Sequence, residues 1–489
     1  MMTVGIKAFG AYIPKVRLQR AVMAQAYSWF NPALTSLQQG ERAIANWDED
    51  ALTMGVEAAR NALDSEQCQN IDSLYFASTT FPFQDRQNAG LVAEALHLGT
   101  NLHAVDMTGS QRCGTSSLLT ALRVAIGGDG SALVIAGEKR QTKAAGALQL
   151  TSGDGAAAFL IGPGAGCATL VGYGTQSIDF VDHYRGQNQA FDYSWEERWV
   201  RDEGFMKIVP KAVTQSFEHA NVSGSAIDHF CFPSSPRRVA QSLAKTLGIK
   251  EGAVRDNLQG KSGEAGCAHP LLMLAHALEG ATPNQLILVV GFGQGCDALL
   301  FRTTDKIVDQ TPTKTVSNLL TTGRSDDNYH RYLAINGLVT IDQGLRAEVD
   351  KQTGLTTLYR NKDMLLGLIG GHCTACDTFQ YPKTNLCVNP ECGAMNTQTD
   401  HPFSNMSCRL ASYTADRLTF SPDPPAYYGM IQFDQGGRAM MDFTDIAPGS
   451  TLVVGQPMQL MFRVKDYDTA RGFRRYFWKA VPLNNNGEH

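Results

Sequence analysis

The sequence predicts an α/β layered body up to residue 303, followed by a small cysteine-rich module and a β-barrel. Three observations predict this order. Short apolar runs alternate with helical stretches in the first part, four cysteines cluster between 373 and 392, and short alternating runs split by Pro and Gly follow residue 408. Alternating strands and helices are typical of α/β layers. Short strands bounded by turns are typical of a small barrel.

Continuous apolar runs predict central strands that are covered on both faces. Six such runs lie in the first part of the chain, at 73–79, 131–137, 156–162, 228–233, 285–293 and 297–302. Helical stretches lie between them, for example at 48–63 and 237–248. The runs 131–137 and 285–293 each end in a glycine turn and each precede another strand. We therefore expect two similar halves, residues 1–175 and 176–303.

The rest of the chain divides into three further segments. Residues 304–365 begin with a polar stretch and continue with amphipathic runs, so we expect a linker with docking helices. Residues 366–402 hold the cysteine pairs. Residues 403–489 hold five short alternating runs and are expected to form the barrel, which we interpret as an OB fold.

Composition excludes several classes of protein. The formal net charge of -5 gives no electrostatic reason to expect nucleic acid as a partner. The first residues show no basic region followed by an apolar core, and no apolar run reaches membrane-spanning length. Eleven cysteines in 489 residues do not make a disulfide framework. We therefore expect a cytoplasmic protein that binds neither nucleic acid nor a membrane.

Five short motifs occur in one order along the first part. They are GAYIPKVRL (10–18), GTSSLLTAL (114–122), SGDGAAAFLIG (152–162), GCAHPLLML (266–274) and VVGFGQG (289–295). Together they resemble the signatures of hydroxymethylglutaryl-CoA (HMG-CoA) synthases in the thiolase superfamily. The resemblance implies a duplicated five-layer αβαβα body, an acyl-CoA substrate and a homodimer with its contact near residues 105–125.

The cysteine module and the barrel resemble the zinc-ribbon/OB-fold proteins that accompany thiolases. Cys373, Cys376, Cys387 and Cys392 have the spacing C-x2-C-x10-C-x4-C. Two close pairs of thiolates on turns suit a tetrahedral zinc ion, and four cysteines leave no open position, so we expect a structural Zn²⁺. The resemblance also implies a partner enzyme of the same pathway.

The family nucleophile is a cysteine three residues before the Gly-Thr pair that opens a helix. Here that pair is Gly114-Thr115, so the resemblance places Gln111 at the nucleophile position. Cys113 comes two residues later, which on a helix turns a side chain by about 200°. The alternative is a local bulge that brings Cys113 into the site. Cys113 is otherwise expected to be a small buried packing residue.

The other family positions also differ in this sequence. The glutamate base corresponds to Thr79, the histidine to Pro233 and the asparagine to Glu264. Threonine is not a base at neutral pH, and proline has no side-chain chemistry. An acyl-enzyme needs an activated thiolate with a base or an oxyanion partner, and a glutamine cannot be acylated in this way.

Cleavage of a β-hydroxyacyl-CoA without an acyl-cysteine needs a base for the hydroxyl group and hydrogen-bond donors for the enolate. Glu264 is the available carboxylate, and we expect its partial desolvation to raise its pKa. The Gln111 amide and the backbone N–H groups around Gly291 and Gly293 are the expected donors. His269 is a second acid/base candidate, although a helix histidine satisfied by the backbone fits it equally well.

A basic cluster lies in the last predicted strand. Arg474 and Arg475 suit the phosphates of a CoA nucleotide, and Thr79 is expected to line the substrate site. The aromatic residues of the barrel are those its core needs.

Three functions remain open from the sequence. The first is an aldol or retro-aldol enzyme that acts on an acyl-CoA. The second is a Claisen-type acyltransferase, HMG-CoA-synthase-like or thiolase-like, that uses Cys113. The third is a non-catalytic subunit that binds acyl-CoA within a thiolase complex. Glu264 is a carboxylate where the resemblance implies a neutral asparagine, and this ionisable group favours the aldol or retro-aldol enzyme over the non-catalytic subunit.

Overall fold

The computed structural model of the protein describes residues 3–128, 130–234, 236, 238–310 and 312–483. The chain divides into two compact units. Unit 1 consists of Met1–Asn46, Asp50–Ala93 and Leu98–Leu338, and unit 2 of Trp47–Glu49, Glu94–His97 and Val339–His489. Residues 1–2 of the expected first half and 484–489 of the expected barrel lie outside the described residues.

Unit 1 is built on a nine-stranded sheet. From edge to edge its strands are β11 (His229–Cys231), β12 (Leu286–Phe292), β13 (Gly295–Thr303), β8 (Ala168–Ser177), β1 (Val4–Tyr12), β7 (Gly155–Pro163), β6 (Ala132–Glu138), β4 (Ser73–Ala77) and β5 (His103–Met107). The pairs β11–β12, β6–β4 and β4–β5 are parallel, and the other pairs are antiparallel. Both ends of the sheet thus follow one pattern, in which parallel strands at the edge are followed by two antiparallel neighbours. This repeat agrees with the predicted duplication.

Two helices lie between the halves of the sheet. α5 (Cys113–Ile126) contacts β4, β6 and β7 of the first half and β12 and β13 of the second. α11 (His269–Glu279) contacts β1 and β7 as well as β11 and β12. Because both helices are covered on two sides, their leucines belong to the main core.

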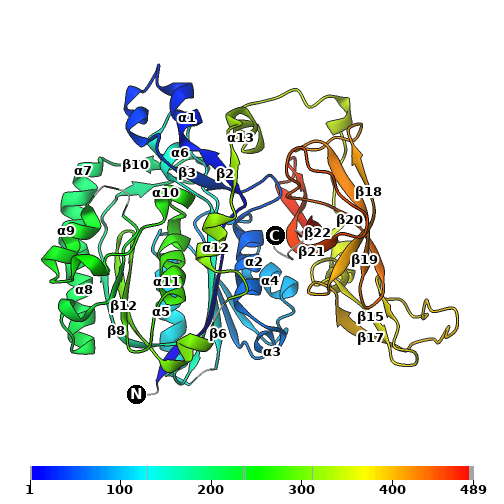
Figure 1. Cartoon of the computed structure of the whole chain (residues 1–489), viewed down its shortest axis with the longest axis horizontal. Coiled ribbons are helices and arrows are strands. Elements are labelled where there is room, and N and C mark those ends of the chain that lie inside the picture. Colours follow the sequence, from blue (N-terminus) through cyan, green and yellow to red (C-terminus); the bar gives the residue numbers. More distant parts are fainter. Residues whose placement is uncertain (1–2, 129, 235, 237, 311, 484–489) are drawn as a thin grey trace. The chain divides into compact units, whose positions relative to one another are not determined.

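Two further helices cover the outer faces of the sheet. α2 (Ala51–Ala62) packs on the first half, and α8 (Met206–Ala220) packs on the second. α2 begins at Asp50, whose side chain accepts a hydrogen bond from Thr53 N at 3.0 Å, which fixes the start of the helix. Figure 1 shows the layers in order, with α5 and α11 in the middle. The five-layer αβαβα prediction is confirmed.

The six strands predicted from apolar runs are confirmed as β4, β6, β7, β11, β12 and β13. The helical stretches 48–63 and 237–248 contain α2 and α9 (Val239–Thr246). β1, β5 and β8 are not among the predicted strands. β8 spans the expected boundary at residue 175 and pairs with β13, so it lies in the second half of the sheet.

Shorter elements complete unit 1 and the chain that leads to unit 2. The strands are β2 (Val16–Gln19), β3 (Glu41–Ile44), β9 (His183–Tyr184), β10 (Tyr193–Ser194) and β14 (Arg324–Asp326). The helices are α1 (Arg20–Tyr27), α3 (Ser65–Cys68), α4 (Asn88–Ala95), α6 (Ala147–Thr151), α7 (Glu197–Trp199), α10 (Gln259–Ser262), α12 (Val316–Thr321), α13 (Tyr329–Ile335), α14 (Leu355–Arg360) and α15 (Lys362–Leu365). Of the segment expected as a linker, the part up to Leu338 lies in unit 1 and the part from Val339 lies in unit 2.

Unit 2 holds two small sheets. The first has the order β16 (Phe379–Gln380), β15 (Ile369–Cys373), β17 (Gln398–Pro402). The second has the order β20 (Arg438–Asp442), β19 (Ala426–Phe433), β18 (Cys408–Asp416), β21 (Pro457–Asp468), β22 (Phe473–Pro482). A parallel bridge between Phe443 and Ala480 joins the end of β20 to β22. The third and fifth strands thus meet in parallel and close the sheet, which is the topology of a five-stranded OB barrel.

The barrel core is aromatic. The Trp478 ring lies edge-on to Phe462 with centroids 5.4 Å apart, and both side chains are fully buried. These rings fill the interior, as expected for a small barrel. Among the described residues of both units, no helix combines the length and the apolar character that a membrane span requires.

Candidate active site and metal centre

Gln111 lies in the turn that leads into α5, and the β12–β13 hairpin packs against this turn. Ser110 Oγ donates to the Gly293 carbonyl at 2.6 Å, and Arg112 Nε donates to the same oxygen at 3.1 Å. A Cβ atom on Gly293 would come within 2.7 Å of Ser110 Oγ. The glycine therefore permits a close approach of two backbones. The Gly293 N–H group donates to the Gly295 carbonyl at 3.0 Å. It therefore stabilises the hairpin and is not available as the donor to an enolate that the sequence led us to expect.

Gly291 has a similar packing role. A Cβ atom there would lie 2.2 Å from Thr115 Oγ1, so only glycine lets α5 approach β12 this closely. Asp297 on β13 strengthens the same junction, because its carboxylate accepts from Arg112 Nη1 at 2.8 Å and from Ser116 Oγ at 2.6 Å. The backbone on both sides of Gln111 is thus anchored to the second half of the body.

The Gln111 side chain faces two cationic or ionisable donors. Its amide satisfies its neighbours in one orientation, with the oxygen 2.8 Å from Arg140 Nη2 and 3.1 Å from His183 Nε2. Arg140 Nη1 faces the same oxygen. Arg140 is the second residue after strand β6, and His183 lies on β9. The structure therefore brings together, around Gln111, two residues that the sequence patterns did not indicate.

The short hairpin β9–β10 holds these donors in place. Asp192 accepts from Arg140 Nε at 3.1 Å and from Arg185 Nη1 at 3.1 Å, and His183 Nδ1 lies 3.0 Å from Asp182 Oδ2. Burial disfavours the charge of Arg140, but the carboxylates of Asp192, Glu138 and Glu264 outweigh this effect and raise the pKa of Arg140. Arg140 is therefore a permanent cation at the centre of an acidic site.

Thr79, where the resemblance implies a glutamate, donates to a carboxylate. Its Oγ1 lies 3.0 Å from Glu138 Oε1, and its N–H donates to the same atom at 3.1 Å. Thr80 Oγ1 and the Cys267 N–H group also donate to Glu138, at 2.6 Å and 3.2 Å. Glu138 is fully buried at the end of β6. The site thus has a buried carboxylate near the expected position, but it comes from a neighbouring strand and is enclosed by donors.

Cys113 is the first residue of α5 and is 4% exposed. It belongs to the main apolar core together with Cys267. Burial raises the pKa of Cys267 well above its ordinary value, and the contacts with Cys113 and Glu138 add to this effect. Cys113 therefore packs against a protonated thiol in the core, as expected for a buried packing residue.

Glu264 lies in the loop before α11. Its N–H donates to the Thr151 carbonyl at 2.8 Å and its own carbonyl accepts from Gly153 N at 2.8 Å, which fixes the loop against the end of α6. The residue is partly exposed, and its carboxylate acts electrostatically on both Arg140 and His269. Glu264 is thus a partly exposed carboxylate that acts electrostatically on Arg140, the cation that holds Gln111.

His269 is fully buried at the start of α11, and both of its ring nitrogens have backbone partners. Nδ1 accepts from Ala265 N at 3.1 Å, and Nε2 lies 2.7 Å from the Asn257 carbonyl. Burial lowers the pKa of His269, although Glu264 and the Asn257 carbonyl act in the opposite direction. This geometry is that of a neutral histidine satisfied by the backbone, and it leaves no ring nitrogen for a substrate.

The basic cluster of β22 is paired within unit 2. Arg475 Nε donates to Asp466 Oδ1 at 2.9 Å, and Arg474 lies over the Tyr467 ring at 5.1 Å. Arg471 donates to Asp468 at 2.7 Å. Acidic partners on β21 neutralise part of the positive charge of this cluster, and a tyrosine ring covers Arg474. The cluster is therefore a weaker anion site than the sequence alone indicates.

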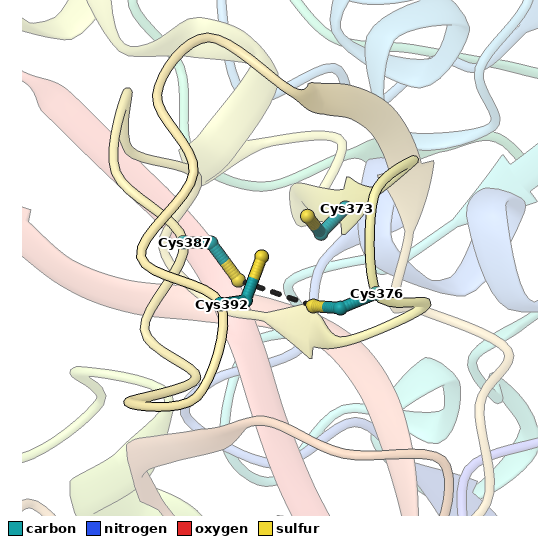
Figure 2. Close-up of side chains that lie close together, drawn as sticks. All are labelled: Cys373, Cys376, Cys387 and Cys392. Atoms are coloured by element: carbon teal, nitrogen blue, oxygen red, sulfur yellow. Dashed lines mark hydrogen bonds between the residues drawn. The ribbon is translucent and has the colours of Figure 1, made fainter.

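Four cysteine side chains converge in unit 2, as Figure 2 shows. The sulfur atoms of Cys373, Cys376, Cys387 and Cys392 all lie within 4.8 Å of one another. Those of Cys376 and Cys387 are 3.5 Å apart. Two turns thus present four soft ligands to one point, a donor set that fits a tetrahedral Zn²⁺. Cys408 lies apart in the barrel, where its thiol donates to the Met458 carbonyl at 3.3 Å.

Two family models match parts of the chain. The model described as 3-oxoacyl-[acyl-carrier-protein] synthase III C terminal matches residues 217–302, and that of the ChsH2 rubredoxin-like zinc ribbon domain matches residues 366–396. The HMG-CoA synthase of Aeropyrum pernix is 29% identical over 344 residues, which are 69% of this chain and 95% of that protein. The HMG-CoA synthase of Pyrococcus furiosus is 28% identical over 311 residues, 62% of this chain and 86% of that one.

Solved structures agree on the fold. A crystal structure of HMG-CoA synthase complexed with CoA aligns with a TM-score of 0.59 at 17% identity, over 72% of this chain and 96% of that one. The 3-oxoacyl-(acyl carrier protein) synthase III of Pseudomonas aeruginosa aligns with a TM-score of 0.55 at 19% identity, over 62% and 98%. Unit 1 therefore has the thiolase-like fold of these structures. The chain is similar in sequence to HMG-CoA synthases, and its residues 366–396 match the ChsH2 rubredoxin-like zinc ribbon.

Sequence reasoning missed Glu138, Arg140, His183 and Asp192. A signal existed for the first two, because they lie within three residues after the predicted strand 131–137, and ligands of open α/β sheets gather at the carboxyl ends of strands. No motif marks the hairpin that carries the other two. Pro233, where the resemblance implies a histidine, follows β11 and offers no side-chain chemistry.

Proposed function

We propose that unit 1 binds an acyl-CoA and makes or breaks the C–C bond next to the thioester in aldol or retro-aldol manner, without an acyl-cysteine intermediate. The names of the relatives support the substrate class, since they are HMG-CoA synthases, and one aligned structure holds CoA. The preferred substrate is a β-hydroxyacyl-CoA.

The observation that carries this proposal is the environment of Gln111. The residue stands at the implied nucleophile position with its amide held by Arg140 and His183, while Cys113 lies in the core against Cys267. An amide does not form a thioester, but it donates hydrogen bonds to one. A site built in this way suits a thioester that stays attached to CoA.

The reaction assigns one role to each residue. In the cleavage direction, Glu264 accepts the proton of the β-hydroxyl group as the new carbonyl forms and the Cα–Cβ bond breaks. The electron pair moves into the thioester as an enolate, and the Gln111 N–H group donates to its oxygen. The proton taken up by Glu264 then returns, directly or through water, to the α-carbon. The reverse sequence forms the bond.

We further propose that the four cysteines bind one structural Zn²⁺ and that Thr79 lines the acyl site. The four sulfur atoms within 4.8 Å support the metal assignment. The zinc ion contributes folding free energy to unit 2 and takes no part in the reaction. Unit 2 remains a secondary CoA-binding candidate through Arg474 and Arg475.

The test compares two alanine variants. Purified protein is incubated with a panel of β-hydroxyacyl-CoA esters, and the shortened acyl-CoA and the carbonyl product are measured by chromatography. We expect Cys113→Ala to retain turnover and Gln111→Ala to lose most of it. Turnover that needs Cys113 would instead support the Claisen mechanism, and binding of the esters without turnover by the wild type would support the non-catalytic subunit.

A further inference from the structure

The orientation of the Gln111 amide follows from Arg140. A guanidinium group donates hydrogen bonds and cannot accept them. The Gln111 atom that faces both terminal nitrogens of Arg140 is therefore the oxygen. His183 Nε2 lies 3.1 Å from the same oxygen, so this ring nitrogen carries a proton.

The second ring nitrogen of His183 faces a carboxylate. Nδ1 lies 3.0 Å from Asp182 Oδ2. The side chains of His183 and Asp182 are 19% and 14% exposed, so this contact holds the ring in a largely dry environment.

We propose that Arg140 and His183 are positioning residues that present the Gln111 amide nitrogen to the thioester oxygen of the substrate. This inference rests on the proposed function and adds to it the groups that make Gln111 an oxyanion donor. In this proposal His183 is the histidine that positions Gln111. It lies on the hairpin β9–β10 and not after β11, where Pro233 replaces the histidine that the resemblance implies.

Two donor side chains on one amide oxygen have a chemical consequence. They draw electron density toward the oxygen and strengthen the N–H groups on the other side of the amide, because hydrogen bonds in series polarise one another. Ser110 and Arg112 hold the adjoining backbone through Gly293. The donor is therefore fixed before the substrate binds, which is the requirement for stabilising an enolate.

The hairpin supplies the counter-charges for this arrangement. Asp192 binds both Arg140 and Arg185, and Arg185 in turn donates to the Thr79 carbonyl. The hairpin is thus bound to Thr79 at the end of β4 as well as to Arg140 after β6. A substitution in the hairpin should therefore change the position of the Gln111 side chain without altering the fold of the sheet.

The first arm of the test is independent of the reaction. Nitrogen-15 NMR of the full chain, labelled at histidine, reports which ring nitrogens carry protons, and the His183→Asn variant identifies the His183 signals. We expect His183 Nε2 to carry a proton. An unprotonated Nε2 would overturn the inference whether or not the protein turns over an acyl-CoA.

The second arm uses Gln111→Glu, which retains an oxygen for Arg140 and His183 but removes the N–H donor. Turnover should fall by about 10²–10³, the usual cost of one oxyanion donor, with little change in KM. Exposed His330 provides a matched control, because His330→Asn should leave turnover unchanged. Normal turnover of Gln111→Glu would refute the donor role. An inactive wild type with the expected NMR signals would refute the proposed function alone.

Discussion

Besides Asp192, two carboxylates lie near Arg140, and their surroundings differ. Glu138 is fully buried and accepts hydrogen bonds from Thr79, Thr80 and Cys267. A carboxylate enclosed in this way has no free face for a substrate. Glu264 is partly exposed and lies in a loop. The general base of the proposed reaction is therefore Glu264.

Glu264→Gln tests this assignment, because it preserves the shape of the side chain and removes the basic oxygen. Turnover of the true substrate should fall by about 10²–10⁴ while the affinity for the CoA ester stays the same. Loss of a merely helix-stabilising charge would cost less than about 1 kcal/mol and leave turnover intact. The control is the exposed Glu251→Gln. Near-normal turnover of Glu264→Gln would end the proposal for this residue.

His269 gives a prediction for pH. Burial lowers its pKa in the folded state, so as the pH falls through about 6.5 the unfolded chain binds a proton that the folded chain does not. The free energy of unfolding of unit 1 should therefore decrease on acidification, by up to about 1.4 kcal/mol per pH unit from this group. Urea unfolding between neutral and mildly acidic pH should show a shallower decrease for His269→Gln. An equal slope in both proteins would contradict the buried neutral histidine.

At the scale of elements, the sequence predicted what depends on local pattern. Runs such as 131–137 and 285–293 are apolar because both faces of the sheet are covered, and they are found as β6 and β12. The hairpin β9–β10 has two-residue strands and polar or aromatic side chains, so no periodicity marks it. Its importance comes from Asp192 and His183 meeting residues more than forty positions away. Such contacts depend on tertiary packing, which a single sequence does not display.

The residue spacing before α5 is a local pattern of the predictable kind. Counting back from Gly114-Thr115 without a gap predicted that Gln111 and Cys113 lie in different environments. The structure places Gln111 beside Arg140 and His183, and Cys113 in the core. The spacing alone could not decide whether Glu264 or His269 is the better candidate for the general base. The structure favours Glu264, because both ring nitrogens of His269 are occupied by backbone groups.

The zinc ribbon gives a prediction at the scale of one element. Treatment with a chelator should unfold residues 370–480 while unit 1 stays folded, because metal binding is coupled to folding in such small modules. Hydrogen exchange followed by mass spectrometry locates the loss. Cys376→Ser should act in the same way, whereas Cys408→Ala, outside the cluster, should keep one zinc per chain. Retention of stoichiometric zinc by a Cys376→Ser, Cys387→Ser double variant would refute the assignment.

At the scale of the whole molecule, the sheet of unit 1 ends at β5. Within the described residues β5 pairs with β4 on one side and has no strand on the other. Exposed strand edges are commonly covered, and a symmetric pairing of two copies would cover this one. We therefore expect a homodimer whose contact includes the segment 105–125. Light scattering at micromolar concentration should give twice the mass of the chain, and the mass of a single chain would count against this interface.

In the proposed reaction the acyl group never leaves CoA for the protein. Intact-protein mass spectrometry after incubation with acetyl-CoA, acetoacetyl-CoA or a turned-over β-hydroxyacyl-CoA tests it directly, because an acyl-cysteine adds a defined mass. We predict that the protein mass stays unchanged during turnover, since Gln111 is not acylated and Cys113 packs in the core. An acyl adduct that maps to Cys113 and forms as fast as the reaction proceeds would contradict the account and restore a Claisen mechanism.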